Sequence, residues 1–478
     1  MAAMSLPSHK TRIVATIGPS SESQEIVERL IRAGMNVARL NFSHGDFSAH
    51  AGRIARIRAA ETATGRRVAI MADLPGPKMR VGTIDPEPIE LRAGDAFTLT
   101  TDDVVGTSSR VSVSFDRLPQ VVRPGHALFL NDGLVQLSVD RVDGREVHCR
   151  VTVGGELRSR KGLNLPGIDL GIPAFTDHDR ACLAFALEHG VDAVSQSFVE
   201  TAEDIEAVRK AARELGGNPF IIAKIERAGA LAHFADILTA ADGIMVARGD
   251  LGVEVPIERI AITQKDLIAQ ANLAGKPVIT ATQMLESMVA SRIPTRAEAT
   301  DVANAILDGT DCVMLSAESA VGRFPEEAVA TLARIAAETE QHRPHAQDAV
   351  LEYYRTHRPT TGAEAIATVV EHALDTVPCD VVFVPTRTGT TARMLARFKP
   401  VVWVVAVSRR ASVCQGLLFS YGVYPVQIDR EPEDWQQFGR EWMREQGVNG
   451  HNAMLVAGPS DAHPEAHHRL EFMRLATS

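Results

Sequence analysis

The sequence has few cysteines, no long hydrophobic run and no excess of positive charge. Its 478 residues include five cysteines, an odd number without CxxC spacing, which argues against a disulfide framework or a zinc site. The most apolar run, VVWVVAV at 401–407, is far too short to cross a bilayer, and the first residues, MAAMSLPSHK, contain no apolar core of signal-peptide length. We therefore expect a cytoplasmic protein without membrane contact. The net charge of −10 argues against general nucleic-acid binding, but it allows a local basic pocket for a phosphorylated small molecule.

Several catalytic and cofactor motifs are also missing. No GxGxxG follows the first predicted strand, which argues against an open, doubly wound dinucleotide-binding sheet. The sequence contains no convincing nucleophile elbow and no Cys/His pair, so nucleophilic acyl chemistry has no support.

What the sequence does contain is a regular alternation of short apolar runs and amphipathic stretches. The runs predict strands beginning near residues 12, 35, 66, 191, 219, 242, 277 and 311. Helices are predicted at 22–33, 46–62, 177–189, 202–214, 227–239, 257–273, 297–308 and 325–340. Eight βα units in series predict an α/β fold, a closed parallel (β/α)8 (TIM) barrel.

Two regions depart from this alternation of strands and helices. Residues 78 to about 170 carry hairpin signals such as NDG at 131–133 and no long helical period, which predicts a small inserted β-barrel domain that serves as a lid. After a polar segment at 341–360 a second α/β pattern begins and predicts a compact C-terminal α/β domain. The expected division is 1–76 and 172–345 for the barrel, 77–171 for the insert and 346–478 for the C-terminal domain.

The stretch AKIERAGAL, at 223–231, carries the first functional signal. Lys224 and Glu226 lie two residues apart at the end of an apolar run, so in a strand both side chains point the same way. Asp250 follows the next strand, where GIMVA gives way to what reads as a glycine-containing loop. This trio suits a divalent cation beside an anionic substrate. A strand-end salt bridge without catalytic role explains the trio equally well when it is taken alone.

The other predicted strand ends shift this balance towards a functional site. Barrel enzymes place their chemistry at the carboxyl ends of the strands, and polar or charged groups follow six of the eight. Several cations beside carboxylates suit a metal-bridged phosphate, and phosphoryl transfer mainly requires positioning and charge neutralisation. The additional strand-end residues are Arg39, Asn41, Ser43, Asp73, Lys78, Arg80, Arg248, Gly249, Thr282 and Ser316.

Six segments, in this order, closely resemble the pyruvate kinase family. They are TRIVATIGPSS, GMNVARLNFSHG, IIAKIERAGAL, DGIMVARGDLGVEVP, ATQMLESM and PTRAEATDVANAILDGTDCVMLSAES. The resemblance runs from about Thr11 to Pro325 and continues more weakly to about Ile428. It implies transfer of the phosphoryl group of phosphoenolpyruvate to ADP, giving pyruvate and ATP, with Mg²⁺ or Mn²⁺ as the cofactor.

The resemblance also implies individual roles. Arg39 would bind the substrate phosphate, and Lys224 would neutralise the transferring phosphoryl group and the developing enolate. Glu226 and Asp250 would hold the metal, with Asp250 also close to the substrate. Thr282 and Ser316, with ordered water, both offer a route for protonating the enolate, and the sequence does not choose between them. The pyruvate carboxylate would lie against Thr282 and the backbone of Ala247, Arg248 and Gly249.

The nucleotide and monovalent-cation sites follow from the same resemblance. Asn41, His44, Arg80 and Lys161 correspond to the nucleotide side of the site, and His44 reads as a contact rather than a metal ligand.

Residues Asn41, Ser43 and Asp73 match potassium ligands of the family. Potassium-dependent members read DTKGPEIR after the third strand, whereas this chain reads DLPGPKMR, with Lys78 in place of the acidic residue. A fixed ammonium there repels K⁺, so we expect activity that does not require potassium.

The C-terminal domain resembles the family's regulatory domain. The loop PTRTGTTARM offers hydroxyls and backbone N–H groups at a predicted helix start, which suits a phosphorylated effector such as a sugar phosphate or AMP. An ordinary capped helix is the alternative. The chain lacks the glycine-rich, Thr-Asn-containing loop that the family commonly has before its last strand. A homotetramer is expected from the resemblance alone. The proposed effector residues are Thr386, Arg387, Thr388, Gly389, Thr390 and Thr391.

Two other functions fit part of the pattern. A metal-dependent pyruvate-enolate aldolase on the same barrel also needs a divalent metal, but the lid and the pair Arg80 and Lys161 argue against it. A non-catalytic sugar-phosphate sensor would keep the fold, but the intact set of strand-end residues argues against that reading.

Overall fold

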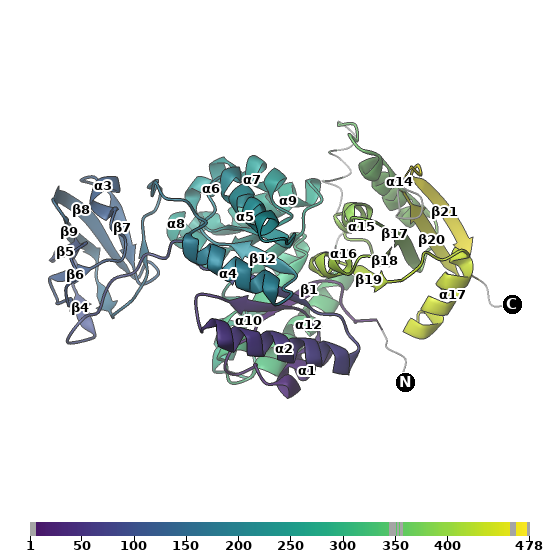
Figure 1. Ribbon diagram of the computed structural model, residues 1–478, viewed down its shortest axis with the longest axis horizontal. Coiled ribbons are helices and arrows are strands. Elements are labelled where there is room, and N and C mark those ends of the chain that lie inside the picture. The colour runs from purple at the N-terminus through teal and green to yellow at the C-terminus, as the bar shows by residue number, and fades with distance from the viewer. Residues whose placement is uncertain (1–5, 344–349, 351–352, 354–356, 459–464, 476–478) are drawn as a thin grey trace.

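The core of the molecule is a closed barrel of eight parallel strands (Figure 1). The structure is a computed structural model that describes residues 6–343, 350, 353, 357–458 and 465–475. Both faces of most strands are buried, which explains why they read as continuous apolar runs. The predicted barrel is confirmed. Its strands are β1 (Arg12–Thr16), β2 (Met35–Asn41), β3 (Ala69–Leu74), β12 (Ala193–Gln196), β13 (Phe220–Ile225), β14 (Gly243–Ala247), β15 (Val278–Ala281) and β16 (Cys312–Leu315).

Helices cover the outside of the barrel. Several begin at the side-chain caps that the sequence signals: Ser23 accepts a hydrogen bond from the Ile26 amide, and Thr295 and Glu298 form a capping box. The covering helices are α1 (Gln24–Ala33), α2 (Phe47–Thr64), α4 (Asp177–Glu188), α5 (Ala202–Glu214), α7 (Phe234–Ala240), α9 (Ile260–Leu273), α10 (Arg296–Leu307) and α12 (Pro325–Gln341).

Two local predictions were wrong. The helix expected over 227–239 is divided at His233 into α6 (Ala228–Ala232) and α7. The loop expected after β14 is a helix, α8 (Arg248–Glu254), which begins directly at the strand end. Ala247 precedes α8 and offers no capping side chain, while the helix contains Gly249 and Gly252, so its sequence lacks the usual signals of a helix start.

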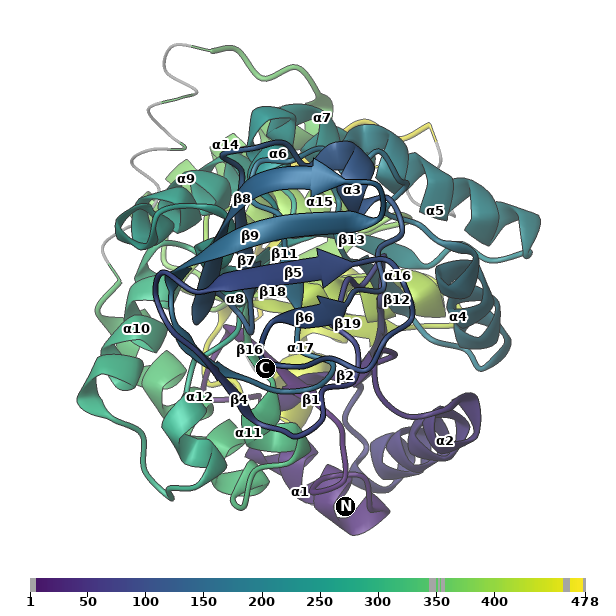
Figure 2. The ribbon, with the colours of Figure 1, turned by 90° about the vertical axis from the view of Figure 1, so that its left-hand side faces the viewer.

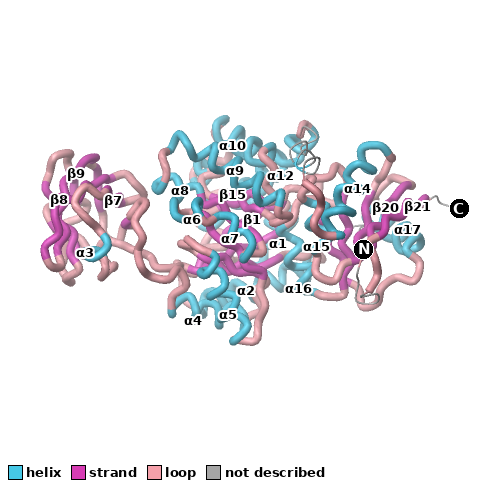
Figure 3. Tube along the Cα trace, turned by 90° about the horizontal axis from the view of Figure 1, so that it is seen from above, coloured by secondary structure: helices cyan, strands magenta, loops and turns pink. Residues whose placement is uncertain are grey.

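The insert between β3 and α4 is a separate β domain with its own apolar core. Figure 1 shows it beyond one end of the barrel, and Figure 3 shows the two connections that join it to the barrel. Six strands form one sheet in the order β11-β7-β8-β9-β5-β6, and β10 pairs with β4. The elements are β4 (Ile89–Leu91), β5 (Ala96–Thr100), β6 (Arg110–Ser112), a short helix α3 (Leu118–Val121), β7 (Ala127–Leu130), β8 (Val135–Asp143), β9 (Glu146–Val153), β10 (Gly155–Leu157) and β11 (Leu163–Asn164).

The C-terminal α/β domain lies at the opposite end of the barrel (Figure 1). Its sheet has the order β19-β18-β17-β20-β21, and only the β20–β21 pair is antiparallel. Its elements are α14 (Gly362–Thr376), β17 (Val381–Pro385), α15 (Thr390–Ala396), β18 (Trp403–Ser408), α16 (Ala411–Gly416), β19 (Val423–Gln427), α17 (Trp435–Gln446), β20 (Asn452–Ala457) and β21 (Arg469–Arg474). The exact limits of the domains stay a prediction.

The C-terminal domain closes the amino end of the barrel. The helix α16 ends at Gly416, and the next residues, Leu417–Phe419, form a short 3₁₀ turn. Leu418 and Phe419 of this turn join the core inside the barrel, and the ring of Phe419 stacks on Phe220 with centroids 5.4 Å apart. The apolar turn therefore closes the amino end of the barrel, which we call its base.

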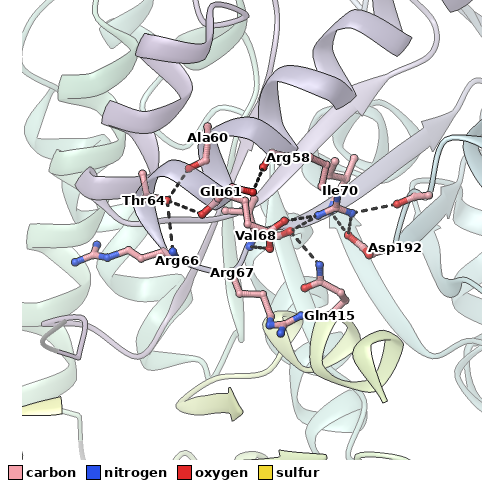
Figure 4. A network of polar contacts seen from close by, with 12 residues as sticks. Arg58, Ala60, Glu61, Thr64, Arg66, Arg67, Val68, Ile70, Asp192 and Gln415 are labelled. Atoms are coloured by element: carbon pink, nitrogen blue, oxygen red, sulfur yellow. Dashed lines mark hydrogen bonds and ion pairs between the residues drawn. The ribbon is translucent and has the colours of Figure 1, made fainter. Parts of the chain in front are cut away.

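Polar contacts reinforce this end of the barrel (Figure 4). Arg58 of α2 donates to the Val68 carbonyl at 2.9 Å and to Asp192 at 2.7 Å, and Gln415 of the C-terminal domain also donates to the Val68 carbonyl. The Ile70 amide donates to the same Asp192 carboxylate at 2.7 Å. The base is thus bonded to its surroundings, and the insert lies at the other end of the barrel, in front of it in Figure 2.

Within the described residues, no helix is both long and apolar enough to cross a membrane. All five cysteines are free.

Candidate active site

Lys224 stands at the centre of the charged strand ends. Its Nζ donates to Ser197 Oγ at 2.6 Å and lies 3.2 Å from Glu226 Oε2 and 3.5 Å from Asp73 Oδ1. Burial by itself lowers the pKa of this ammonium group, but Asp73 and Glu226 outweigh burial, so the pKa of Lys224 is raised. The side chain therefore remains cationic at neutral pH. Strand alternation had predicted that Lys224 and Glu226 share a side, and the structure brings them together.

Glu226 has one engaged and one available oxygen. Its Oε1 accepts a hydrogen bond from the Phe198 amide at 2.6 Å, whereas Oε2 is buried and has no hydrogen bond from any residue that the structure describes. Burial, reinforced by the charge of Asp250, raises the pKa of Glu226 to about 7 against the opposing effect of Lys224. Oε2 thus has an ion-pair contact with Lys224 but no hydrogen bond from a described residue, so it keeps bonding capacity that suits a further cation.

Asp250 lies in the first turn of α8 and is exposed to solvent. Its charge acts on Glu226, so the two carboxylates face the same region. Within the described part of the chain, no group of three or more His, Cys, Asp or Glu side chains could hold a metal ion. Two carboxylates fit Mg²⁺ nonetheless, since this ion commonly keeps several waters and takes its other ligands from substrate phosphates.

Asp73 and Arg39 form a buried pair beside Lys224. Asp73 Oδ2 accepts from Arg39 Nε at 2.9 Å and from Nη2 at 2.5 Å, and Oδ1 accepts from Ser195 Oγ at 2.8 Å. Burial raises the pKa of Asp73, but Lys224 and Arg39 outweigh it and lower the pKa to about 2. Arg39 Nη1 also donates to Thr16 Oγ1 at 2.9 Å, which leaves part of its five-donor fork for a substrate. The carboxylate thus orients both cations.

The fourth barrel strand supplies partners that the sequence analysis missed. Ser195 and Ser197 lie on and just after β12, and Phe198 follows with a positive φ of 61°. These residues bond Asp73, Lys224 and Glu226. The alternation of serines in SQSF at the end of an apolar strand was the available signal, because a buried strand has little use for two hydroxyls.

The residues after β2 and β3 form the next part of the rim. Asn41 Oδ1 accepts from the Ser43 amide at 3.0 Å. Burial, together with Lys78, Arg80 and Arg39, lowers the pKa of His44, so its ring is neutral at pH 7. Lys78 is solvent-exposed, but the surrounding protein and the charges of Lys224 and Arg80 lower its pKa to about 8, against Asp73 and Glu226.

Arg80 and Lys161 come together on the insert. The backbone of Arg80 forms an antiparallel β-bridge with Gly162, the neighbour of Lys161. The Val81 amide donates to the Lys161 carbonyl at 2.9 Å. Arg80 Nη1 donates to the Arg160 carbonyl at 3.1 Å. Two cations from distant parts of the sequence therefore lie on one edge of the insert.

Thr282 contacts the start of α8. Its Oγ1 accepts from the Gly249 amide at 2.7 Å and donates to the Ala281 carbonyl at 2.7 Å. Space is tight here, since a Cβ added to Gly249 would lie 3.4 Å from Thr282 Oγ1. Ala247, at the end of β14, leads into this contact, whereas the side chain of Arg248 turns towards Asp301 of α10 at 2.7 Å.

Ser316 lies at the end of the neighbouring strand β16. Its amide donates to Glu318 Oε2 at 2.7 Å, and the other oxygen of this buried carboxylate accepts from the Leu285 amide at 3.1 Å. Ser316 and Thr282 thus belong to adjacent segments that Glu318 ties together. The structure keeps both as candidates.

The proposed effector residues form one turn in the C-terminal domain, far from these strand ends (Figure 1). Thr386 Oγ1 accepts from the Gly389 amide at 2.9 Å, and the hydroxyls of Thr388 and Thr390 lie 2.9 Å apart. Thr386, Gly389 and Thr391 are buried, whereas Arg387, Thr388 and Thr390 are exposed. Part of the loop is therefore engaged locally and part faces solvent.

An ammonium group held among carboxylates at the open end of a (β/α)8 barrel, with further cations on a covering insert, defines an enzyme for anionic, metal-bound substrates. Comparison with known proteins specifies the class further. The sequence profile described as "Pyruvate kinase, barrel domain" matches residues 8–329, and that described as "Pyruvate kinase, alpha/beta domain" matches 364–464. The chain belongs to the pyruvate kinase family and is a phosphotransferase.

Individual relatives agree with this assignment. A pyruvate kinase of Thermococcus litoralis is 50% identical over 428 residues, which cover 89% of this chain and 90% of the relative. One of Clostridium acetobutylicum is 41% identical, covering 88% and 89%. A crystal structure of a pyruvate kinase from Cryptosporidium parvum superposes with a TM-score of 0.91 at 37% identity, covering 98% and 97%. The family uses a divalent metal, phosphoenolpyruvate, ADP or ATP, and pyruvate; the aldolase and sensor alternatives receive no support.

Proposed function

We propose that the carboxyl end of the barrel transfers the phosphoryl group of phosphoenolpyruvate to ADP, with Lys224 as the central cation. The observation that carries this assignment is the position of Lys224 Nζ, within 3.5 Å of both Asp73 and Glu226 and with its charge retained. As the phosphoryl group leaves, negative charge accumulates on the enolate oxygen. A fixed ammonium in a largely water-excluded site stabilises that charge more strongly than the charge of the ground state.

Glu226 and Asp250 would hold Mg²⁺ or Mn²⁺, which when bound would neutralise charge on the phosphate and on the enolate. Support comes from the Glu226 oxygen that has no hydrogen bond among the described residues, and from the charge of Asp250 acting on it. Arg39 would bind the substrate phosphate with the donors that Asp73 and Thr16 leave over.

The carboxylate of pyruvate would lie against the first turn of α8. The Gly249 amide already donates to Thr282 Oγ1, so substrate binding at this amide would displace that bond or use it through the threonine hydroxyl. Either route brings Thr282 next to the reacting molecule. Protonation of the enolate would then proceed through Thr282 or through Ser316, with water.

The insert would bind the nucleotide and cover the site. Arg80 and Lys161 on its edge suit the phosphates of ADP, with Asn41 and His44 on the same side. The turn of the insert at Gly133 lies beside α8, since a Cβ there would be 3.7 Å from Val253. A lid in this position excludes water from the reacting phosphate.

Lys78 would make K⁺ unnecessary. Its ammonium group acts electrostatically on Lys224 and Asp73, in the region where Asn41, Ser43 and Asp73 would otherwise hold a monovalent cation. A resident cation there supplies the same charge without a bound ion.

A coupled assay of pyruvate formation from phosphoenolpyruvate and ADP with Mg²⁺ tests these assignments. We expect turnover in potassium-free buffer with tetramethylammonium as the only monovalent cation. Absence of pyruvate would contradict the function, whereas a large drop without K⁺ would contradict only the role of Lys78.

Regulation and assembly extend the proposal. The turn at 386–391, with exposed Arg387, Thr388 and Thr390, would take a sugar phosphate or AMP, and family membership supports a homotetramer in the cytoplasm. The assay repeated with a panel of these phosphates, and sedimentation of the purified chain, test both points. Unchanged kinetics with every phosphate would refute the effector site, and a monomer would refute the tetramer.

A further inference from the structure

The turn after β15 has an unusual backbone at its functional residue. Thr282 has a φ of 69° and Gln283 a φ of 53°, so two consecutive residues with side chains occupy the left-handed region. This conformation is sterically costly for a β-branched residue such as threonine. It persists only where the surrounding structure imposes it.

The side chain of Arg248 supplies that constraint. Its Nη2 donates to the Thr282 carbonyl at 2.8 Å, and its Nε donates to the Ala281 carbonyl at 3.3 Å. The guanidinium fork thus holds two successive carbonyls of the turn. Its remaining amino group, Nη1, is anchored by Asp301 at 2.7 Å and Gln264 at 3.3 Å.

The residue next to Arg248 holds the same turn from its other side. The Gly249 amide donates to Thr282 Oγ1 at 2.7 Å, so the start of α8 binds both the backbone and the hydroxyl of Thr282. The backbone of Arg248 is expected beside the pyruvate carboxylate, while its side chain leads into the layer between α9 and α10.

We propose that Arg248 is a positioning residue, whose guanidinium imposes the left-handed turn at Thr282 and Gln283 and thereby fixes the hydroxyl of Thr282 against the substrate. This inference rests on the proposed role of Thr282. The side chain of Arg248 does not touch the substrate; it acts through the carbonyls of Ala281 and Thr282.

Arg248→Lys is the sharpest test, because lysine keeps a charge near Asp301 but cannot span two carbonyls. A displacement of about 1 Å at a reacting group can lower the rate about 100-fold. We expect kcat to fall by roughly that factor, with a much smaller change in KM for phosphoenolpyruvate and little change in Tm. The metal-dependent exchange of pyruvate methyl protons in D₂O, followed by NMR, should fall in parallel.

Rescue distinguishes positioning from general support of the fold. Glycine adopts a positive φ without steric cost, so Gln283→Gly should make the turn easier to form. We expect Gln283→Gly alone to remain within about twofold of the parent, and the double variant with Arg248→Lys to recover roughly tenfold in kcat. Lys265→Met is the matched control, since Lys265 pairs with Asp308 between the same two helices without contacting the turn.

Three outcomes with the Arg248→Lys enzyme would overturn the proposal: a near-normal kcat, a loss of kcat that merely follows a loss of Tm, or a loss of kcat that Gln283→Gly does not relieve. Thr282→Val with normal turnover and exchange would also overturn it. Failure of the proposed reaction is distinguishable, because it would appear as absent pyruvate formation in the parent enzyme.

Discussion

The two ends of the barrel each bury a lysine–carboxylate pair, but the carboxylates of the two pairs differ in their hydrogen bonds. At the base, the Asp311 carboxylate meets Lys399 Nζ at 2.8 Å and accepts from the amides of Tyr421 at 2.9 Å and Val278 at 3.1 Å. At the open end, Glu226 Oε2 has an ion-pair contact with Lys224 but no hydrogen bond among the described residues. A lysine–carboxylate pair therefore indicates a site only when its carboxylate keeps an oxygen without a hydrogen bond.

The surroundings of the two pairs differ in the elements that they join. The base pair lies beside the turn of Leu418 and Phe419, and Arg12 crosses the same boundary to donate to the Ser420 carbonyl at 3.0 Å. The open-end pair is flanked by the positive-φ residues Phe198 and Thr282, but Lys399 of the base pair also has a positive φ, of 53°, so backbone strain does not separate the two ends. A carboxylate with both oxygens hydrogen-bonded suits a junction between domains, whereas a carboxylate oxygen without a hydrogen bond suits a site that must respond to a substrate.

Lys224→Met gives the largest expected effect and tests the open end. Loss of the ammonium group removes the charge that stabilises the enolate, so we expect kcat to fall by at least about 10³-fold, as for the loss of a strong electrostatic donor. Mn²⁺ binding, measured by electron paramagnetic resonance, should persist because Glu226 and Asp250 remain. A variant with near-normal kcat would refute the role of Lys224.

Lys399→Met tests the base. Lys399 is fully buried, and burial lowers its pKa although Asp311 opposes this effect. Removing one partner of a buried pair typically costs about 3–5 kcal/mol, so we expect a loss of that size in the free energy of unfolding. Denaturant unfolding measures the loss.

The matched control for the base is Lys265→Met, which breaks a more exposed pair with Asp308 and should cost about 1 kcal/mol or less. The Lys399→Met enzyme, assayed at a temperature where it is still folded, should have a kcat similar to that of the parent enzyme. Equal stability losses in the two variants, or a selective loss of kcat in Lys399→Met, would break the distinction between the two ends.

The sequence predicted the open end far better than the base. Lys224 and Glu226 are two residues apart on one strand, so their common orientation follows from strand geometry alone. Asp311 and Lys399 belong to different domains, and their contact depends on how the C-terminal domain docks. Nothing local in the sequence encodes such a contact.

The unusual backbone of the site could not be predicted from the preferences of the local sequence either. Thr282 adopts a positive φ that its residue type disfavours, and α8 starts without a capping side chain. The turn at Thr282 is held by the side chain of Arg248, which comes from the preceding barrel unit. Propensity describes what a segment prefers by itself, so it does not reveal a conformation imposed by a distant group.

The smallest expected effect concerns Lys78, a charged group of the open end that is exposed. Its pKa is lowered to about 8, first because surrounding protein partly desolvates it and then because Lys224 and Arg80 repel its charge. Lysine is cationic below its pKa, so the resident charge is present at pH 7 and is progressively lost as the pH rises through 8. Potassium-free activity should therefore decline several-fold between pH 7 and 9, and added K⁺ should restore part of it only at the higher pH.

Two variants sharpen the test of Lys78. Lys78→Arg keeps a cation across this range, so its potassium-free activity should not show the decline around pH 8. Lys78→Glu replaces the cation with a carboxylate and should make turnover depend on K⁺ already at pH 7. If K⁺ stimulates the parent equally at pH 7 and pH 9, or if Lys78→Arg declines as the parent does, then the charge of Lys78 does not substitute for the ion. The open end would in that case resemble the base more closely than proposed, with a lysine whose charge serves only the local structure.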